Sequence, residues 1–193
     1  QGYEVPDELA KDIKVELPPG LVGDPAAVPR CSNADFININ VADRRPSCSD
    51  STAVGTILLK LGNPGPAYLT AAVHNLAPPP GVVQKLGFVV FLVPITIEFT
   101  VNPDPPYNVI ASLDNTNQTL PFYSSDLTVW GNPADPRHDP FRGVCTASGF
   151  SSQPEFGNPL GKLCPANTTE VPFLTAPRAC TGPLSTTSVS YTH

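Results

Sequence analysis

The chain has 193 residues, with 17 acidic and 11 basic side chains and a formal net charge of −6. This length suits one domain with a sizeable hydrophobic core. The acidic balance argues against a nucleic-acid partner, which needs a basic patch to displace the counterions of the phosphates. No apolar run reaches the roughly 18 residues that a membrane span needs, so we expect no span in this chain.

The sequence contains 25 prolines, far above the usual share of about 5 %. These prolines separate strongly apolar runs, which a disordered chain lacks. They therefore indicate the turns and strand ends of an all-β fold.

The N-terminal part of the sequence predicts an arm, a strand and short helical turns. Residues 1–12 are polar and acidic and are expected to form the arm. Residues 12–17 alternate between apolar and polar side chains, which predicts a strand with one solvated face. Residues 32–35 match a capping box and predict a single helical turn that ends near Phe36. A second short turn is expected around residues 50–53.

Apolar runs alternate with proline-rich turns through the rest of the chain. They predict strands at residues 54–61, 68–76, 86–93, 96–101, 107–113, 126–130 and 184–191. Residues 134–177 lack periodicity and are expected to form a long, cysteine-bearing loop. Short strands with turns every roughly 8–12 residues predict a single domain over residues 1–193, an immunoglobulin-like β-sandwich.

The cysteines favour disulfides over a metal site. They are Cys31, Cys48, Cys145, Cys164 and Cys180. No Cys-x2-Cys pair typical of zinc sites occurs, and the flanking Pro, Ser and Gly residues suit loop disulfides of an oxidising, extracellular compartment. We expect Cys31 and Cys48 to pair and to close a local loop.

One of the three remaining cysteines must be left over. Pairing Cys145 with Cys180 would fasten both ends of the long loop to the sandwich, and we favour it. Cys164 would then be free or joined to a neighbouring chain. Pairing Cys145 with Cys164 stays open, because loop-closure entropy separates the two arrangements by less than about 1 kcal/mol.

Catalytic motifs are not recognisable, so we predict that the chain is not an enzyme. The sequence lacks a Gly-x-Ser-x-Gly nucleophile elbow. Among its histidines, only His138 is suitably placed to act as a base. Loop carboxylates show no pattern that would pair them for glycoside hydrolysis.

The densest group of functional side chains lies in residues 130–142. The candidates are Trp130, Asp135, His138, Asp139 and Arg142. Asp135 and Asp139 could hold a Ca²⁺ ion, and Trp130 could stack on a sugar. The simpler interpretation requires no cofactor: the carboxylates bind backbone N–H groups and arginines, and Trp130 packs in the core.

Two Asn-x-Thr sequons offer glycosylation sites in a host that modifies secreted proteins. Their acceptors are Asn117 and Asn167.

Several long motifs carry a family resemblance. They include Leu-Pro-Pro-Gly-Leu-Val-Gly-Asp-Pro at 17–25, Pro-Arg-Cys-Ser at 29–32 and Asn-Leu-Ala-Pro-Pro-Pro-Gly at 75–81. They continue with Trp-Gly-Asn-Pro-Ala-Asp-Pro at 130–136 and Cys-Thr-Gly-Pro-Leu at 180–184. In this order the chain resembles a β-rich, immunoglobulin-like surface domain that recurs in large secreted proteins of actinobacteria.

The resemblance implies secretion and a surface role, without an activity. It also implies a further strand upstream of residue 17, for which the residues before Lys11 leave little room. A missing strand would leave a gap open to a strand of a partner chain.

We therefore expect a non-catalytic extracellular module with a structural or adhesive role. It would be a surface-array or filament subunit, or one domain of a larger cell-surface protein, with other subunits or domains as partners. The alternative is a carbohydrate-binding module that holds surface glycans with Trp130, Tyr107 or Tyr123. A secreted hydrolase built around His138 is the least favoured reading.

Overall fold

The computed structural model describes residues 8–62, 67–117, 122–146, 150–151, 162–178 and 182–192. The strands are β1 (Ala10–Glu16), β2 (Val22–Gly23), β3 (Ile39–Asn40), β4 (Arg45–Pro46), β5 (Ala53–Leu61), β6 (Ala67–Leu76), β7 (Gln84–Val90), β8 (Val93–Val101), β9 (Val109–Leu113), β10 (Phe122–Val129), β11 (Phe150–Ser151), β12 (Leu174–Thr175) and β13 (Thr187–Thr192). The helical elements are α1 (Asn33–Ile37) and the short 3₁₀ turns η1 (Asp50–Thr52), η2 (Pro136–Phe141) and η3 (Gly143–Cys145).

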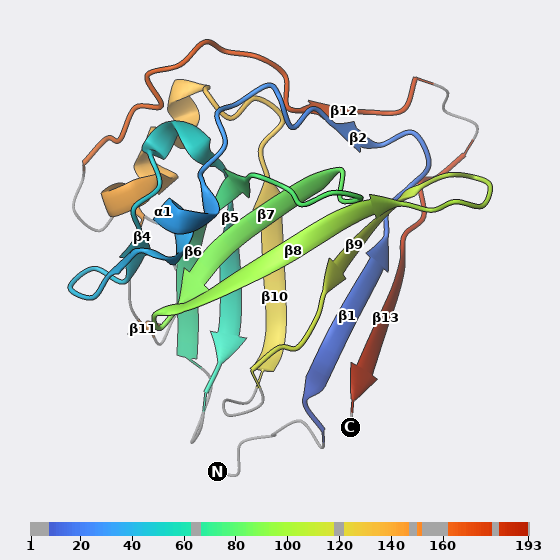
Figure 1. Cartoon of the computed structure of the whole chain (residues 1–193), viewed down its shortest axis with the longest axis horizontal. Coiled ribbons are helices and arrows are strands. Elements are labelled where there is room, and N and C mark those ends of the chain that lie inside the picture. The colour runs from blue at the N-terminus through green and yellow to red at the C-terminus, as the bar shows by residue number, and fades with distance from the viewer. Residues whose placement is uncertain are drawn as a thin grey trace.

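The long strands form one curled antiparallel sheet. Its nine strands run in the order β10-β5-β6-β7-β8-β9-β1-β13, with β11 paired to β6. Figure 1 shows β7 and β8 running obliquely across the sheet, with β9, β1 and β13 continuing on one side of them. The all-β class is confirmed, but an immunoglobulin-like sandwich is not, because these strands hydrogen-bond in one continuous sheet rather than in two.

One face of this sheet is apolar across almost its whole width. Cross-strand partners lie on the same face of a sheet, so the register groups the side chains. The apolar side carries the paired residues Leu127, Ile57 and Ala71, the pair Leu86 and Ile97, and the paired residues Phe99, Ala111 and Val15. The opposite row runs through Thr128, Thr56, Lys85, Glu98, Ser112 and Lys14. We call the apolar side the concave face.

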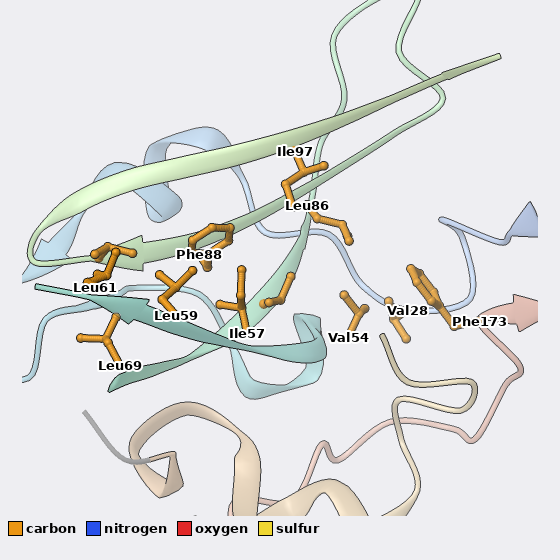
Figure 2. Close-up of a cluster of buried hydrophobic side chains, with 12 residues drawn as sticks. Val28, Val54, Ile57, Leu59, Leu61, Leu69, Leu86, Phe88, Ile97 and Phe173 are labelled. Atoms are coloured by element: carbon orange, nitrogen blue, oxygen red, sulfur yellow. The ribbon is translucent and has the colours of Figure 1, made fainter. Parts of the chain in front are cut away.

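The hydrophobic core occupies the concave face where β5, β6, β7 and β8 curl toward each other. Figure 2 shows Ile57 and Leu59 of β5 gathered with Leu86 and Phe88 of β7, with Phe173 at one end. These side chains are at most 5 % exposed.

A smaller cluster covers part of the convex side. Ser32 caps α1 by accepting a hydrogen bond from the Asp35 N–H, as the capping-box prediction requires. The helix places Phe36 over Gly87, where a Cβ atom would stand 2.5 Å from the Phe36 ring. Glycine at this position therefore lets α1 pack directly on β7.

Several strand predictions need correction. β10 begins at Phe122 rather than residue 126, and β13 begins at Thr187 rather than residue 184. Residues 86–93 do not form one strand, because the chain reverses after Val90 and β8 begins at Val93. Phe91 and Leu92 make the two-residue hairpin turn with φ of 52° and 77°. Such turns normally use Asn or Gly, so the local sequence carried no turn signal.

The first strand also begins earlier than expected, at Ala10 rather than residue 12. It pairs with β9 on one side and β13 on the other. The strand gap that the family resemblance suggested is therefore not found beside it.

Two disulfides hold the loops. Cys31 pairs with Cys48, as predicted. Cys145 pairs with Cys164, so the preferred pairing of Cys145 with Cys180 is wrong, and Cys180 itself lies outside the described residues. The reason is local. The Cys164 N–H donates to the Asp139 carbonyl, so Cys164 lies close to η3, and its Cα atom is 6.0 Å from that of Cys145.

Within the described ranges, no helix is both long and apolar enough to cross a membrane.

Candidate functional site

The loop predicted from the sequence as a site is folded around a stack of the buried Trp130 on the half-buried His138. Trp130 follows β10, donates its backbone N–H to the Val54 carbonyl and is 5 % exposed. Its ring stacks on His138, with centroids 4.3 Å apart and planes 4° from parallel. The Arg142 guanidinium carbon lies 5.5 Å from the centroid of the same ring.

Arg142 is the centre of this loop. Its side chain is fully buried and forms an ion pair with Asp139. It also donates to the carbonyls of Pro133, Asp135 and Cys164. A buried charge is tolerated only when it is paired and hydrogen-bonded in this way.

Asp135 is likewise engaged within the loop. It accepts hydrogen bonds from the backbone and the guanidinium of Arg137, at 2.9 Å from the Arg137 backbone N. These hydrogen bonds lower the pKa of Asp135 to about 2. Burial, and then the positive charge of Arg142, lower the pKa of His138.

The sequence-predicted residues are thus brought together, but as a self-contained structural loop. Both carboxylates face guanidinium groups, and the stacked, buried Trp130 offers no open ring to a sugar. In the described part of the chain, no group of three or more His, Cys, Asp or Glu residues is arranged to hold a metal ion.

The remaining candidates differ in exposure. Tyr107 is 62 % exposed, whereas Tyr123 is half-buried with the Lys60 ammonium 5.5 Å from its ring centroid. Asn117 and Asn167 are both exposed, although residues 118–121 of the first sequon region lie outside the described residues.

A second candidate site is the hollow of the curled sheet. The concave face encloses a half-open cavity of about 1050 Å³. Its floor is formed by core side chains such as Ile57 and Phe88. The half-buried side chains Ile95, Phe99 and Ala111 extend this apolar floor toward β1. We call this space the groove.

The groove has an uncharged lining. Among the described residues that line it, only Gln84, Thr116, Asn117 and Ser125 carry polar side chains, and none is ionisable. Side chains from β2, β12 and Phe173 close one end, near Gln84. Leu61 lies at the opposite end of the core from Phe173 (Figure 2), and its partner Phe122 also lines the groove, as does Asn117.

The edges of the curled sheet flank this site. Within the described residues, β10 and β13 each pair on one side only. Sequence reasoning identified apolar faces on most of these strands, but it assigned them to a sandwich core. In the structure, apolar side chains of β8 and β9 such as Ile95, Phe99 and Ala111 are only half-buried and line the groove.

No protein-family model, no curated protein and no solved structure matches this chain.

Proposed function

We propose that this chain is a non-catalytic extracellular binding module that holds a long apolar molecule, such as a lipid acyl chain, in the groove. One observation carries the proposal: a half-open cavity of about 1050 Å³ whose described lining residues are almost all apolar and include no ionisable group. Pockets for small molecules usually measure about 300–1,000 Å³. The groove is therefore large enough for an extended chain.

The energetics of burial support an apolar occupant. Half-buried side chains such as Ile95, Phe99 and Leu113 line the groove beside the closed core. Each CH₂ group of a ligand that leaves water contributes about 0.8 kcal/mol. A chain of about twelve carbons therefore contributes about 10 kcal/mol before the entropic cost of association.

The extracellular location is supported by chemistry and resemblance. Two disulfides are compatible with an oxidising compartment. The resemblance to secreted actinobacterial surface domains points the same way. A non-catalytic role fits the loop at Trp130, whose ionisable groups are engaged with one another.

A structural or adhesive module is the second candidate. The observation that favours it is that β10 and β13 pair on one side only among the described residues, because an exposed edge can accept a strand from another subunit or domain. In this reading, a neighbouring protein segment covers the concave face.

Binding of a neutral fluorescent probe, N-phenyl-naphthylamine, separates the two functions. The test variant is Ala111→Trp, which fills the groove from β9. The matched control is Ile110→Trp, because Ile110 is the preceding residue of the same strand and faces away from the groove. We expect the wild type and Ile110→Trp to enhance probe fluorescence, and Ala111→Trp to bind at least about tenfold more weakly.

Circular dichroism and thermal unfolding show whether each variant is folded. Equal probe binding by Ala111→Trp and the wild type would remove the groove as the site. A wild type that fails to bind the probe but forms oligomers in sedimentation experiments would favour the structural module instead.

A further inference from the structure

We infer that the groove selects an uncharged lipid with a carbonyl group, such as a fatty-acid ester, whose carbonyl oxygen accepts a hydrogen bond from Gln84. This inference rests on the proposed function, since it names the class of ligand for the same groove. Three features of the structure carry it: a buried donor without an acceptor, its place beside β2, and the absence of charged side chains among the described residues that line the groove.

The Gln84 amide is a buried donor without an acceptor. The side chain is 8 % exposed, and its Nε2 atom has no hydrogen-bond partner among the described residues. Buried polar groups are nearly always hydrogen-bonded, so an orphaned amide requires an explanation. A rotation of the amide toward the groove would let a ligand oxygen supply the missing acceptor.

The register of β7 directs this amide to the groove. Gln84 pairs with Phe99, and the two side chains share the concave face with Leu86 and Ile97. Gln84 lines the groove at the end formed by β2 and β12. A polar group of the ligand would therefore lie at this end, and the apolar chain of the ligand would extend along the apolar floor of the groove.

Gly23 of β2 makes room for the amide on the other side. A Cβ atom at Gly23 would stand 2.8 Å from the Gln84 Oε1 atom. Since real Cβ atoms do not approach so closely, glycine leaves the space in which the amide lies. The amide therefore lies next to the backbone of β2, in space that a larger residue at position 23 would take from it.

The lining residues decide the charge of the ligand. No Lys, Arg, His, Asp or Glu is among the described residues that line the groove. A carboxylate or ammonium buried there would lose its hydration without an opposite charge to replace it. An ester or another neutral carbonyl loses much less, and Gln84 replaces the hydrogen bond that its oxygen made to water.

The test compares three ligands of equal chain length in displacing N-phenyl-naphthylamine: dodecane, methyl dodecanoate and dodecanoate. The measurements are made at about pH 8, where a carboxyl group is ionised. We expect the wild type to bind the ester about five- to tenfold more tightly than the alkane, as one hydrogen bond allows. Dodecanoate should bind most weakly.

Gln84→Met keeps the length of the side chain and removes the donor. We expect it to abolish the preference for the ester while leaving dodecane binding unchanged. Ser125→Ala is the matched control, since it removes a different polar group from the lining and should retain the preference. Gly23→Ala, which displaces the amide by crowding Oε1, should also weaken ester binding and serves if Gln84→Met does not fold.

The outcomes distinguish this inference from the proposed function. Probe binding with an ester preference that survives Gln84→Met, or with dodecanoate as the tightest ligand, overturns the role of Gln84 but keeps the groove as an apolar site. Absence of probe binding by the wild type overturns both.

Discussion

Replacing Arg142 by Met tests whether the loop at residues 130–142 is a structural hub. The side chain of Arg142 is 0 % exposed and that of its partner Asp139 is 12 % exposed. The substitution keeps most of the side-chain volume but removes the positive charge and every donor of the guanidinium. Asp139 is then left as a buried carboxylate without a counter-charge.

The magnitude follows from these contacts. Removing one partner of a buried ion pair costs about 3–5 kcal/mol. The carbonyls of Pro133 and Cys164 also lose a donor, although small shifts of the loop can return them to water. We therefore expect the free energy of unfolding to fall by about 4 kcal/mol, and Tm to fall by about 8–16 °C for a chain of this size.

Urea unfolding followed by circular dichroism measures this change, and the double variant Arg142→Met/Asp139→Leu provides the control. Because the double variant removes both charges, it should be less destabilised than the sum of the two single variants by about 2 kcal/mol. A loss below about 1 kcal/mol for Arg142→Met, or simple additivity in the double variant, would refute the hub.

Three further predictions concern stability. Burial lowers the pKa of His74 from 6.5 to about 4, so at pH values between these two the unfolded chain binds a proton that the folded chain does not. The free energy of unfolding should therefore fall by about 3 kcal/mol as the pH falls from 6.5 to 4, and His74→Gln should flatten that slope in pH-dependent urea unfolding. Leu92 adopts a φ of 77° in an exposed turn, so Leu92→Gly should raise Tm by about 2–4 °C, and an unchanged or lower Tm in calorimetry would contradict this. Cys145→Ser should cost about 3 kcal/mol, the entropy of the closed loop, and peptide mapping of the unreduced wild type should recover Cys145 joined to Cys164.

Local signals in the sequence predicted the local parts of the fold. The capping box at Ser32 predicted α1, and the expected strands at 54–61 and 68–76 match β5 and β6 within a residue. The disulfide between Cys31 and Cys48 closes a short loop and could also be predicted from the sequence. The hairpin at Phe91 and Leu92 could not be predicted from the sequence, because its left-handed backbone is imposed by the pairing of β7 with β8 rather than by either residue.

The site at residues 130–142 was recognised by its composition, but its role depended on long-range contacts. The sequence shows that Asp139 and Arg142 lie near one another, whereas only folding brings the carbonyls of Pro133 and Cys164 to the same guanidinium. Those carbonyls accept hydrogen bonds from Arg142 and hold its side chain inside the loop.

The sequence by itself determined the β class, the alternation of apolar and polar side chains, and the cysteines available for disulfides, because each of these depends on neighbouring residues. The alternation of apolar and polar residues predicts that one face of a strand is apolar, but it does not predict what covers that face. Whether Ile95, Phe99 and Ala111 would meet a second sheet or enclose a groove was decided only by the order, register and curl of the whole sheet. These properties arise from hydrogen bonds between strands far apart in the chain, so the groove and the orphaned amide of Gln84 became visible only in the tertiary structure.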